Sequence, residues 1–286
     1  MANEPMPSLV STAWLAEQMG ASDLRIFDTT VHIRRAPDGG VEIVTASDIW
    51  DEGHIPGSGR LDLVGKISDP NAKLWFTPPA PDDLAAAFAA EGIGEGTRVV
   101  LYDSRFNMWA TRAWWLLRSI GFDTVAVLDG GMKSWAAAGN PVSTDAAPVH
   151  AAGRLVATPR SEIFTDSDGV RAAIEDHSSC IINSLSAENH DGSDAGYGKP
   201  GHIPGAANVP AAGLVDPETQ CYRPLDELRA EFAGAGAGSG PIITYCGGGI
   251  AATSDAFILH LLGHENVTVY DGSLRDWIDK DLPLEV

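Results

Sequence analysis

The sequence PIITYCGGGIAATSDAFILHLLGHE, residues 241–265, runs from β-branched residues into a cysteine, three glycines and a helix-like segment. A similar pattern, RVVLYDSRFNMWATRAWWLLRSIGF, stands earlier in the chain at 98–122. Three further blocks recur in the same order: EGHIPGSGRLDL as PGHIPGAANVPA, DDLAAAFAAEGIG as DELRAEFAGAGAG, and VAVLDGGMKSW as VTVYDGSLRDW. The offset between matching residues drifts only from 148 at the GHIPG histidines to 142 at the final tryptophans. Four ordered blocks at a nearly constant offset indicate two homologous domains that differ by small insertions.

The length of the repeat sets the domain organisation. A unit of roughly 140 residues is large enough to form a domain with its own core, and a chain of 286 residues favours two such domains. The stretch STDAAPVHAAGRLVATPR at 143–160 is rich in Ala, Pro and Thr, which is typical of an exposed connector. We therefore predict an N-terminal domain at 1–145, a linker at 146–159 and a C-terminal domain at 160–286.

Short apolar runs alternate with helical patterns in both copies. This alternation predicts the α/β class, with a mainly parallel sheet in each domain flanked by helices on both faces. In such sheets ligands gather at the carboxyl ends of the strands, and Cys246 directly follows one of the runs. The predicted strands are 24–28, 98–102, 124–128, 180–183, 241–245 and 266–270, and the clearest helices are 109–120 and 252–262.

Composition narrows the possible partners and the compartment. The chain carries 19 basic and 39 acidic residues, a net charge of −20, which argues against binding to nucleic acid. No apolar run approaches membrane-spanning length, and the first residues lack the basic and apolar regions of a signal peptide. Three cysteines without a C-x-x-C pair suit a reducing cytoplasm and argue against a disulfide framework or a cysteine zinc site. We expect a cytoplasmic protein with no metal, no organic cofactor and no membrane or nucleic-acid partner.

Cys246 stands between a predicted strand and a predicted helix, and Gly247, Gly248 and Gly249 follow it. A helix N-terminus is electropositive, and residues without Cβ let successive N–H groups point inward, so this loop is suited to stabilise a thiolate or an anionic sulfur carried on it. The cysteine is then a candidate nucleophile. The alternative from the local pattern alone is a small buried side chain beside a flexible turn. Because the matching position of the first copy holds Asp103, only the second copy can supply a thiol.

The ordered motifs resemble the tandem-domain rhodaneses, the thiosulfate and 3-mercaptopyruvate sulfurtransferases. The resemblance rests on a GHIPG turn in each copy, YD in the first loop, YC in the second, and the DGG-x-x-x-W block, and it extends from about Leu9 to Leu284. It implies two rhodanese domains, of which the first is inactive because Asp103 replaces the cysteine. It also implies that Cys246 takes sulfane sulfur from a small donor, becomes a persulfide, and passes the sulfur to a thiol or to cyanide. The implied binding loop comprises Gly247, Gly248, Gly249, Ile250 and Ala251.

The substrate-binding residues depart from the family pattern. The loop CGGGIAA resembles the neutral loop of mercaptopyruvate enzymes, with Gly248 and Ala251 where that loop has Ser and Thr. Residues 182–205 contain no arginine, although the family holds the substrate carboxylate with arginines there, and Asn183 and Leu185 stand where Asp and Arg are expected. The donor is therefore left open between thiosulfate, 3-mercaptopyruvate and similar compounds. The cations predicted to contact an anionic donor are Arg105, Arg112 and Lys199.

Two other functions are weighed against a sulfurtransferase. A phosphatase would need a longer loop ending in an arginine to hold the phosphoryl group, and this loop carries no cation. A non-catalytic sulfur-relay or regulatory binding module fits the missing arginines, but the cysteine and its glycine loop argue for catalysis. The histidines of the GHIPG turns, His54 and His202, are predicted to be structural because the copy without a cysteine also has one.

Overall fold

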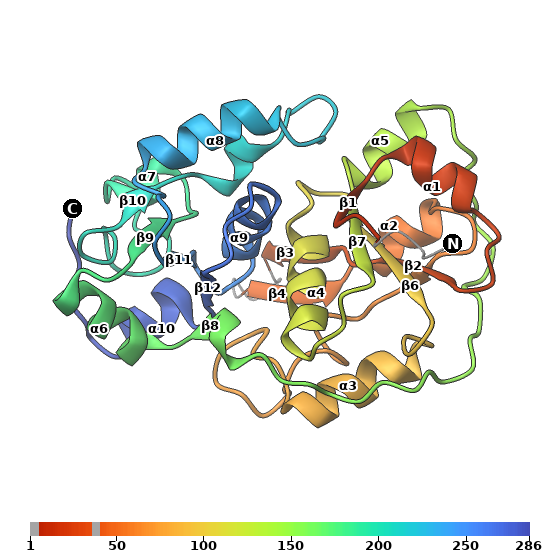
Figure 1. Ribbon diagram of the computed structural model, residues 1–286, viewed down its shortest axis with the longest axis horizontal. Helices are drawn as coiled ribbons and strands as arrows, with labels where there is room; N and C mark the ends of the chain where they lie inside the picture. Colours follow the sequence, from red (N-terminus) through yellow and green to blue (C-terminus); the bar gives the residue numbers. More distant parts are fainter. Residues whose placement is uncertain (1–5, 36–40) are drawn as a thin grey trace. The chain divides into compact units, whose positions relative to one another are not determined.

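The computed structural model describes residues 6–35 and 41–286 (Figure 1). Contacts between residues divide the chain into two compact units. The first comprises the described residues up to Ala72 together with Pro78–Pro159 and Pro217–Cys221. The second comprises Lys73–Thr77, Arg160–Asp216 and Tyr222–Val286. Within the described residues, no helix is both long enough and apolar enough to cross a membrane.

The first unit is built on a five-stranded parallel sheet. Its predicted strands at 24–28 and 98–102 have the expected bounds, and the one predicted at 124–128 begins one residue later. Val99, Val100 and Leu101 are completely buried, as expected for a parallel sheet covered on both faces. The strand order is β1 (Leu9–Val10), β7 (Val125–Leu128), β6 (Arg98–Tyr102), β2 (Leu24–Asp28) and β5 (Gly59–Arg60). The helices are α1 (Thr12–Gln18), α2 (Ser47–Glu52), α3 (Pro81–Ala90), α4 (Met108–Ser119) and α5 (Gly131–Ala137).

The second unit is also built on a five-stranded parallel sheet. The strand predicted at 180–183 has the expected bounds, and those predicted at 241–245 and 266–270 each begin one residue later. The strand order is β10 (Ala207–Asn208), β9 (Cys180–Asn183), β11 (Ile242–Tyr245), β12 (Val267–Tyr270) and β8 (Phe164–Thr165). The helices are α6 (Ser167–Asp176), α7 (Ala187–His190), α8 (Leu225–Gly234), α9 (Ala251–Leu261) and α10 (Ser273–Asp279), with 3₁₀ turns η1 (Ser161–Ile163) and η2 (Ala211–Leu214).

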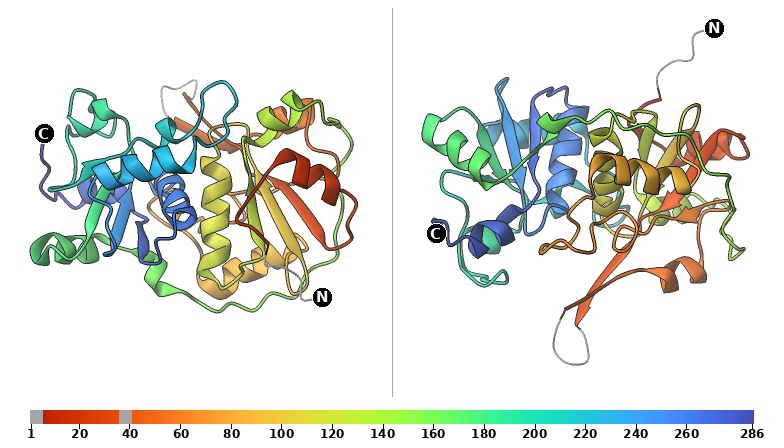
Figure 2. Two further views of the ribbon diagram at one scale, coloured as in Figure 1. Left: turned by 45° about the horizontal axis from the view of Figure 1, so that its top comes forward. Right: turned by 90° about the horizontal axis from the view of Figure 1, so that it is seen from below.

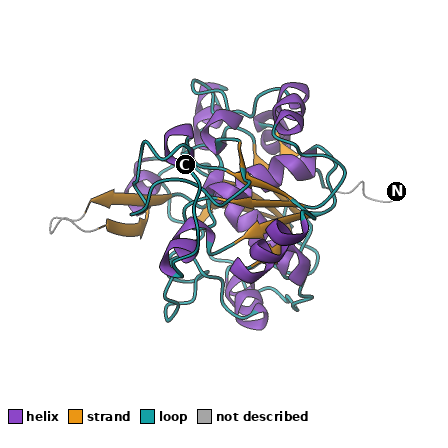
Figure 3. Ribbon diagram, turned by 90° about the vertical axis from the view of Figure 1, so that its left-hand side faces the viewer, coloured by secondary structure: helices purple, strands orange, loops and turns teal. Residues whose placement is uncertain are grey.

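The two sheets have the same topology, which confirms the predicted fold class. Read from one edge, β1-β7-β6-β2-β5 of the first unit matches β8-β12-β11-β9-β10 of the second. Figure 3 shows helices around the strands that lie at the centre of the picture. In both units the middle strand of the sheet, β6 or β11, leads through a short loop into a long helix, α4 or α9. The loop after this middle strand is the place where Asp103 and Cys246 stand.

A two-stranded antiparallel sheet in the first unit was not predicted. It pairs β3 (Val31–Arg35) with β4 (Val41–Thr45), and in the right-hand view of Figure 2 this hairpin, coloured orange, projects away from the parallel sheet of its unit. Within residues 6–35 and 41–286, its strands pair with each other and not with that sheet. The hairpin is thus a local addition to the repeated unit.

The histidines of the GHIPG turns occupy matching structural positions. The Nδ1 atom of His54 lies 2.9 Å from the carbonyl oxygen of Trp50, and the two rings stack at 3.6 Å. Likewise, Nδ1 of His202 lies 2.7 Å from the carbonyl oxygen of His190, and these rings stack at 3.7 Å. The chain takes four residues from Trp50 to His54 but twelve from His190 to His202, so the second copy carries eight additional residues at this point.

Candidate active site

Cys246 is held at the carboxyl end of the middle strand of the second unit. It directly follows β11 and is 3% exposed. Two backbone amides from the start of α10 fix the loop, because Leu274 donates to the carbonyl of Cys246 at 2.9 Å and Arg275 donates to that of Gly247 at 3.1 Å. The thiol therefore stands where ligands of parallel α/β sheets usually bind.

Ser273 anchors the same loop through its side chain. Its Oγ atom accepts hydrogen bonds from the amides of Cys246 and Gly249, both at 3.1 Å, and donates to the carbonyl of Tyr270 at 2.8 Å. A hydroxyl has one hydrogen to give, so Ser273 positions the backbone and does not donate to the Cys246 sulfur, which lies 4.0 Å away. The sequence led us to expect the loop amides to face the sulfur, but two of them face Ser273. The signal was present in the repeat, where Gly131 stands at the matching position.

The remaining amides of the loop are available to a ligand. In the part of the chain that the structure describes, no hydrogen-bond partner is found for the backbone N–H groups of Gly247, Gly248, Ile250, Ala251 and Ala252. They lie at the N-terminus of α9, an eleven-residue helix. Unpaired amides at a helix N-terminus favour a bound anion, because both the N–H groups and the helix dipole attract negative charge.

The matching loop of the first unit is filled by its own carboxylate. Asp103 follows β6 and is 1% exposed. One carboxylate oxygen accepts from the amides of Arg105 at 2.6 Å and Asn107 at 3.2 Å, and the other accepts from Trp109 at 2.9 Å and Ala110 at 3.0 Å. Burial raises the pKa of Asp103 to about 7, although these N–H groups favour the charged form and lower the pKa.

The contacts of Asp103 in the first unit indicate what the Cys246 loop of the second unit is shaped to hold. Three of the four amides that contact Asp103 match, in the repeat, the unpartnered amides of Gly248, Ile250 and Ala252. The carboxylate oxygens of Asp103 thus stand in for an anionic group placed just beyond the side chain of Cys246. A persulfide anion on Cys246 is such a group.

Tyr197, which the sequence did not single out, lies against the thiol loop. A Cβ atom built on Gly247 would lie 2.1 Å from Cε1, 2.2 Å from Cζ and 2.3 Å from the hydroxyl oxygen of Tyr197. The edge of the ring that carries the hydroxyl therefore rests directly on Gly247. Burial, and next the charge of Cys246, raise the pKa of Tyr197 to about 12, so the phenol is protonated at neutral pH.

The three predicted cations lie in different settings. Arg105 is exposed in its loop, whereas Arg112 is buried within α4 at 1% exposure. Lys199, in the insertion that carries Tyr197, forms an ion pair with Asp281. A fourth cation, Arg275, was not predicted; its side chain is 58% exposed and lies 3.8 Å from Asp279. The contacts of Arg105, Arg112 and Lys199 with a donor stay predictions.

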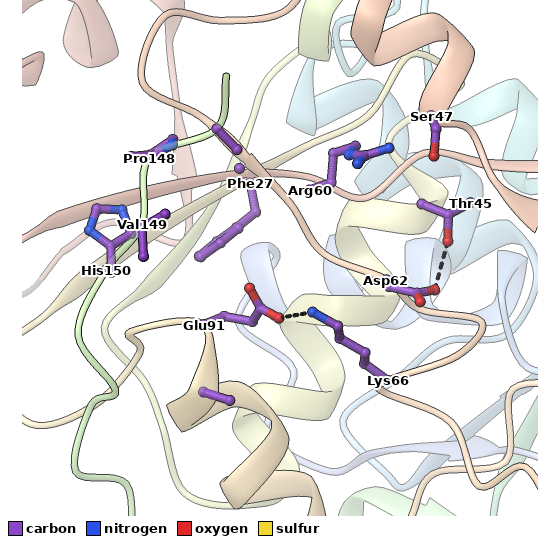
Figure 4. A pocket seen from close by; sticks show the side chains of 13 residues that line it. Phe27, Thr45, Ser47, Arg60, Asp62, Lys66, Glu91, Pro148, Val149 and His150 are labelled. Carbon is purple, nitrogen blue, oxygen red and sulfur yellow. Dashed lines mark hydrogen bonds and ion pairs between the residues drawn. The ribbon is translucent and has the colours of Figure 1, made fainter. Parts of the chain in front are cut away.

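A pocket of about 380 Å³ opens in the first unit, and none of its lining residues belongs to the second (Figure 4). Its cationic side chains have partners, because Lys66 pairs with Glu91 at 2.7 Å and Arg60 lies over the ring of Trp50 at 5.3 Å. Across the described residues, no group of three or more His, Cys, Asp and Glu side chains is arranged as metal ligands. The thiol loop remains the candidate site.

The backbone of the thiol loop predicts unequal effects of two alanine substitutions. Gly249 has a φ of +76°, and a Cβ there would lie 2.6 Å from the carbonyl oxygen of Asp271. Gly249→Ala is expected to lower the free energy of unfolding by about 1–3 kcal/mol. Gly248→Ala is the matched control, because Gly248 has no positive φ and no atom of the described residues lies within 4 Å of a Cβ built there. Urea unfolding followed by circular dichroism measures both, and equal stabilities would contradict the strain at Gly249.

Comparison with known proteins supports the resemblance to the rhodanese family. The model of the rhodanese-like domain matches residues 11–138 and 180–280. A thiosulfate/3-mercaptopyruvate sulfurtransferase of Arabidopsis thaliana is 32% identical over 302 residues, covering 96% of this chain and 84% of the relative. A 3-mercaptopyruvate sulfurtransferase of Escherichia coli is 30% identical, covering 96% of this chain and 97% of the relative. The crystal structure of SseA from Escherichia coli, a 3-mercaptopyruvate sulfotransferase with the rhodanese fold, superposes with a TM-score of 0.80 at 29% identity, covering 94% of this chain and 99% of SseA.

These matches span both copies of the repeat and nearly the whole chain. They confirm the resemblance drawn from the sequence motifs and the enzyme class that it implied. The chain belongs to the rhodanese family and carries two rhodanese-like domains.

Proposed function

We propose that this protein is a sulfurtransferase in which Cys246 carries sulfane sulfur from a small donor, such as thiosulfate or 3-mercaptopyruvate, to a thiol or to cyanide. One observation supports this most directly. Among the described residues, the amides of Gly248, Ile250 and Ala252 beside Cys246 have no hydrogen-bond partner, and their counterparts in the first unit hold the carboxylate of Asp103. The loop thus offers a nucleophile together with a site for the anion that the nucleophile would form.

The proposed reaction has two displacements. The Cys246 thiolate attacks the sulfane sulfur of the donor, a sulfur–sulfur bond forms, and the electron pair of the broken bond leaves with sulfite or with the enolate of pyruvate. The product on the enzyme is a persulfide anion. Cyanide or a thiolate then attacks the outer sulfur, giving thiocyanate or a new persulfide, and the Cys246 thiolate is released unchanged. Neither step calls on a metal or an organic cofactor.

The first domain has a structural part in this proposal. Asp103 satisfies four amides of its own loop and offers no thiol, so we propose that the domain comprising 1–145 is catalytically inactive. The linker at 146–159, the catalytic domain at 160–286 and a cytoplasmic location belong to the same proposal. Small-molecule donors and acceptors are its partners, with no part for nucleic acid.

The competing functions make different demands on the loop. A phosphatase would need a cation among the loop residues, and Gly247 to Ala252 supply none. A sulfur-relay module would form the persulfide but would not turn over with a small acceptor. The number of turnovers per chain therefore separates an enzyme from a relay.

The test is a panel of sulfane donors read by mass spectrometry. Incubation with thiosulfate, with 3-mercaptopyruvate or with methanethiosulfonate is expected to add one sulfur, about 32 Da, to the peptide that contains Cys246, and cyanide is expected to remove it and yield thiocyanate. Absence of the added sulfur with every donor would overturn the proposal. Loading without repeated thiocyanate release would favour the relay, and hydrolysis of a phosphate ester that depends on Cys246 would favour the phosphatase.

A further inference from the structure

The insertion that precedes the second GHIPG turn places an aromatic residue on the thiol loop. The eight additional residues between His190 and His202 belong to the copy that carries the thiol, and Tyr197 lies among them. The hydroxyl edge of Tyr197 rests on Gly247, the residue directly after Cys246. The close approach depends on Gly247, because any Cβ there would overlap the phenol ring.

The phenol hydroxyl is available as a donor. Among the residues that the structure describes, none is found to hydrogen-bond the Tyr197 hydroxyl. The side chain is only partly exposed, and the charge of Cys246 acts on it. A half-buried hydroxyl without a protein partner has its hydrogen free for a ligand held in the same place.

We propose that Tyr197 is a catalytic residue whose hydroxyl donates a hydrogen bond to the outer sulfur of the Cys246 persulfide. This inference rests on the proposed sulfurtransferase function, because it assigns a partner to the intermediate of that reaction. The phenol stabilises the anion without adding a positive charge and keeps its own proton throughout. It complements the loop amides, which approach the sulfur from the backbone side.

The charged groups around Tyr197 keep its phenol protonated, so that it can act as a neutral hydrogen-bond donor to the thiol loop. Asp194, in the same insertion, adds to the burial and the Cys246 charge that hold the phenol in its protonated form. Lys199, two residues further on, is paired with Asp281. Residues 182–205 hold no arginine. A hydrogen bond from a neutral phenol is therefore the interaction that this segment can offer to a sulfur anion.

The experiment compares the wild-type protein with Tyr197→Phe, which keeps the ring and removes the hydroxyl. Both are studied in a Cys180→Ser, Cys221→Ser background so that Cys246 is the one thiol. Cys246 is converted to the persulfide with an aromatic disulfide reagent followed by sulfide, which displaces the aromatic thiolate and leaves the added sulfur on the cysteine. This route does not depend on recognition of a natural donor.

The expected result is a change in the titration of the persulfide, followed by its near-ultraviolet absorbance. A hydrogen bond to the charged form favours that form, so its loss in Tyr197→Phe is expected to raise the pKa of the persulfide by about one unit. The rate constant for loading by thiosulfate is expected to fall, and that for discharge to cyanide to rise, each on the order of tenfold, because the persulfide anion loses a stabilising hydrogen bond. A purely structural role for Tyr197 would leave the titration midpoint unchanged, and that outcome overturns the inference. Unchanged thermal unfolding of Tyr197→Phe shows that the fold is intact.

Gly247→Ala provides a second, independent arm. The added methyl group displaces the phenol ring, so it is expected to raise the persulfide pKa in the presence of Tyr197 but to add no further shift to Tyr197→Phe. Equal shifts in both backgrounds would show that the contact between Tyr197 and Gly247 does not carry the effect, and would overturn the proposed geometry. If small donors load no sulfur while the chemically made persulfide titrates as expected, the proposed function fails and the role of Tyr197 at a persulfide stands.

Discussion

Replacement of Cys246 by serine is expected to lower sulfurtransferase turnover by at least about a thousandfold, because removal of a nucleophile eliminates the covalent route. A serine hydroxyl in the same place is neutral at physiological pH and cannot carry sulfane sulfur. The loop amides that would stabilise the anion then have no anion to hold. The measurement is thiocyanate formation from cyanide with each donor of the panel.

The other two thiols supply matched controls for this substitution. Cys180 is half-buried, and its sulfur lies 3.5 Å from the carbonyl oxygen of Ala235. The sulfur of Cys221 lies 3.5 Å from the hydroxyl of Ser134, within the first unit. Cys180→Ser and Cys221→Ser are expected to keep turnover within a few fold of the wild type. Residual wild-type activity in Cys246→Ser, or its loss in either control, would assign the chemistry to another thiol.

Ser273→Gly is expected to have the second largest effect, because it removes the hydroxyl that fixes the thiol loop. The amides of Cys246 and Gly249 would lose their shared acceptor, and a buried donor left without a partner costs about 1–3 kcal/mol. Glycine suits the backbone there, since Ser273 has a φ of +52° and Gly131 occupies the matching place in the first unit. We expect a loss of about 1–3 kcal/mol in the free energy of unfolding and a fall in kcat on the order of tenfold or more.

Ser273→Ala separates the hydroxyl from the backbone. It also removes the acceptor but keeps a Cβ at positive φ, so it is expected to lose as much kcat as Ser273→Gly and somewhat more stability. Steady-state thiocyanate formation gives kcat, stopped-flow loading gives the rate of persulfide formation, and urea unfolding gives the stability. If both variants form the persulfide at the wild-type rate, the loop does not depend on Ser273 for its geometry.

The sequence alone was sufficient to predict the structural elements that occur in both copies of the repeat. The strands at 24–28, 98–102 and 180–183 are apolar runs flanked by turn residues, so their local pattern agrees with their place in the buried sheet. The two-residue strands such as β5 and β10 have no pattern of their own. They are strands because a neighbouring strand pairs with them, and pairing between distant segments is not visible in a local window.

The residues of the site likewise divide into those that the sequence could predict and those that it could not. Cys246 could be found because its counterpart is Asp103, and Ser273 could have been found in the same way, since Gly131 is its counterpart. Tyr197 has no counterpart at all, because the insertion that carries it is absent from the first copy. A comparison of two copies reveals substitutions, but the position of an inserted loop depends on packing that the sequence does not express. Its contact with Gly247 emerged only from the fold.

The carboxylate that fills the first loop also determines how many anions one chain can bind. A chain with two similar anion-holding loops would ordinarily be expected to take up two equivalents of a sulfur oxyanion. Asp103 already satisfies the amides of one of them, and it is tethered to the backbone at a fixed distance, so a dissolved anion cannot compete it away without unfolding the loop. Sulfite titrated into the protein should therefore saturate at one equivalent per chain. The protein has two homologous domains but a single site for a dissolved anion.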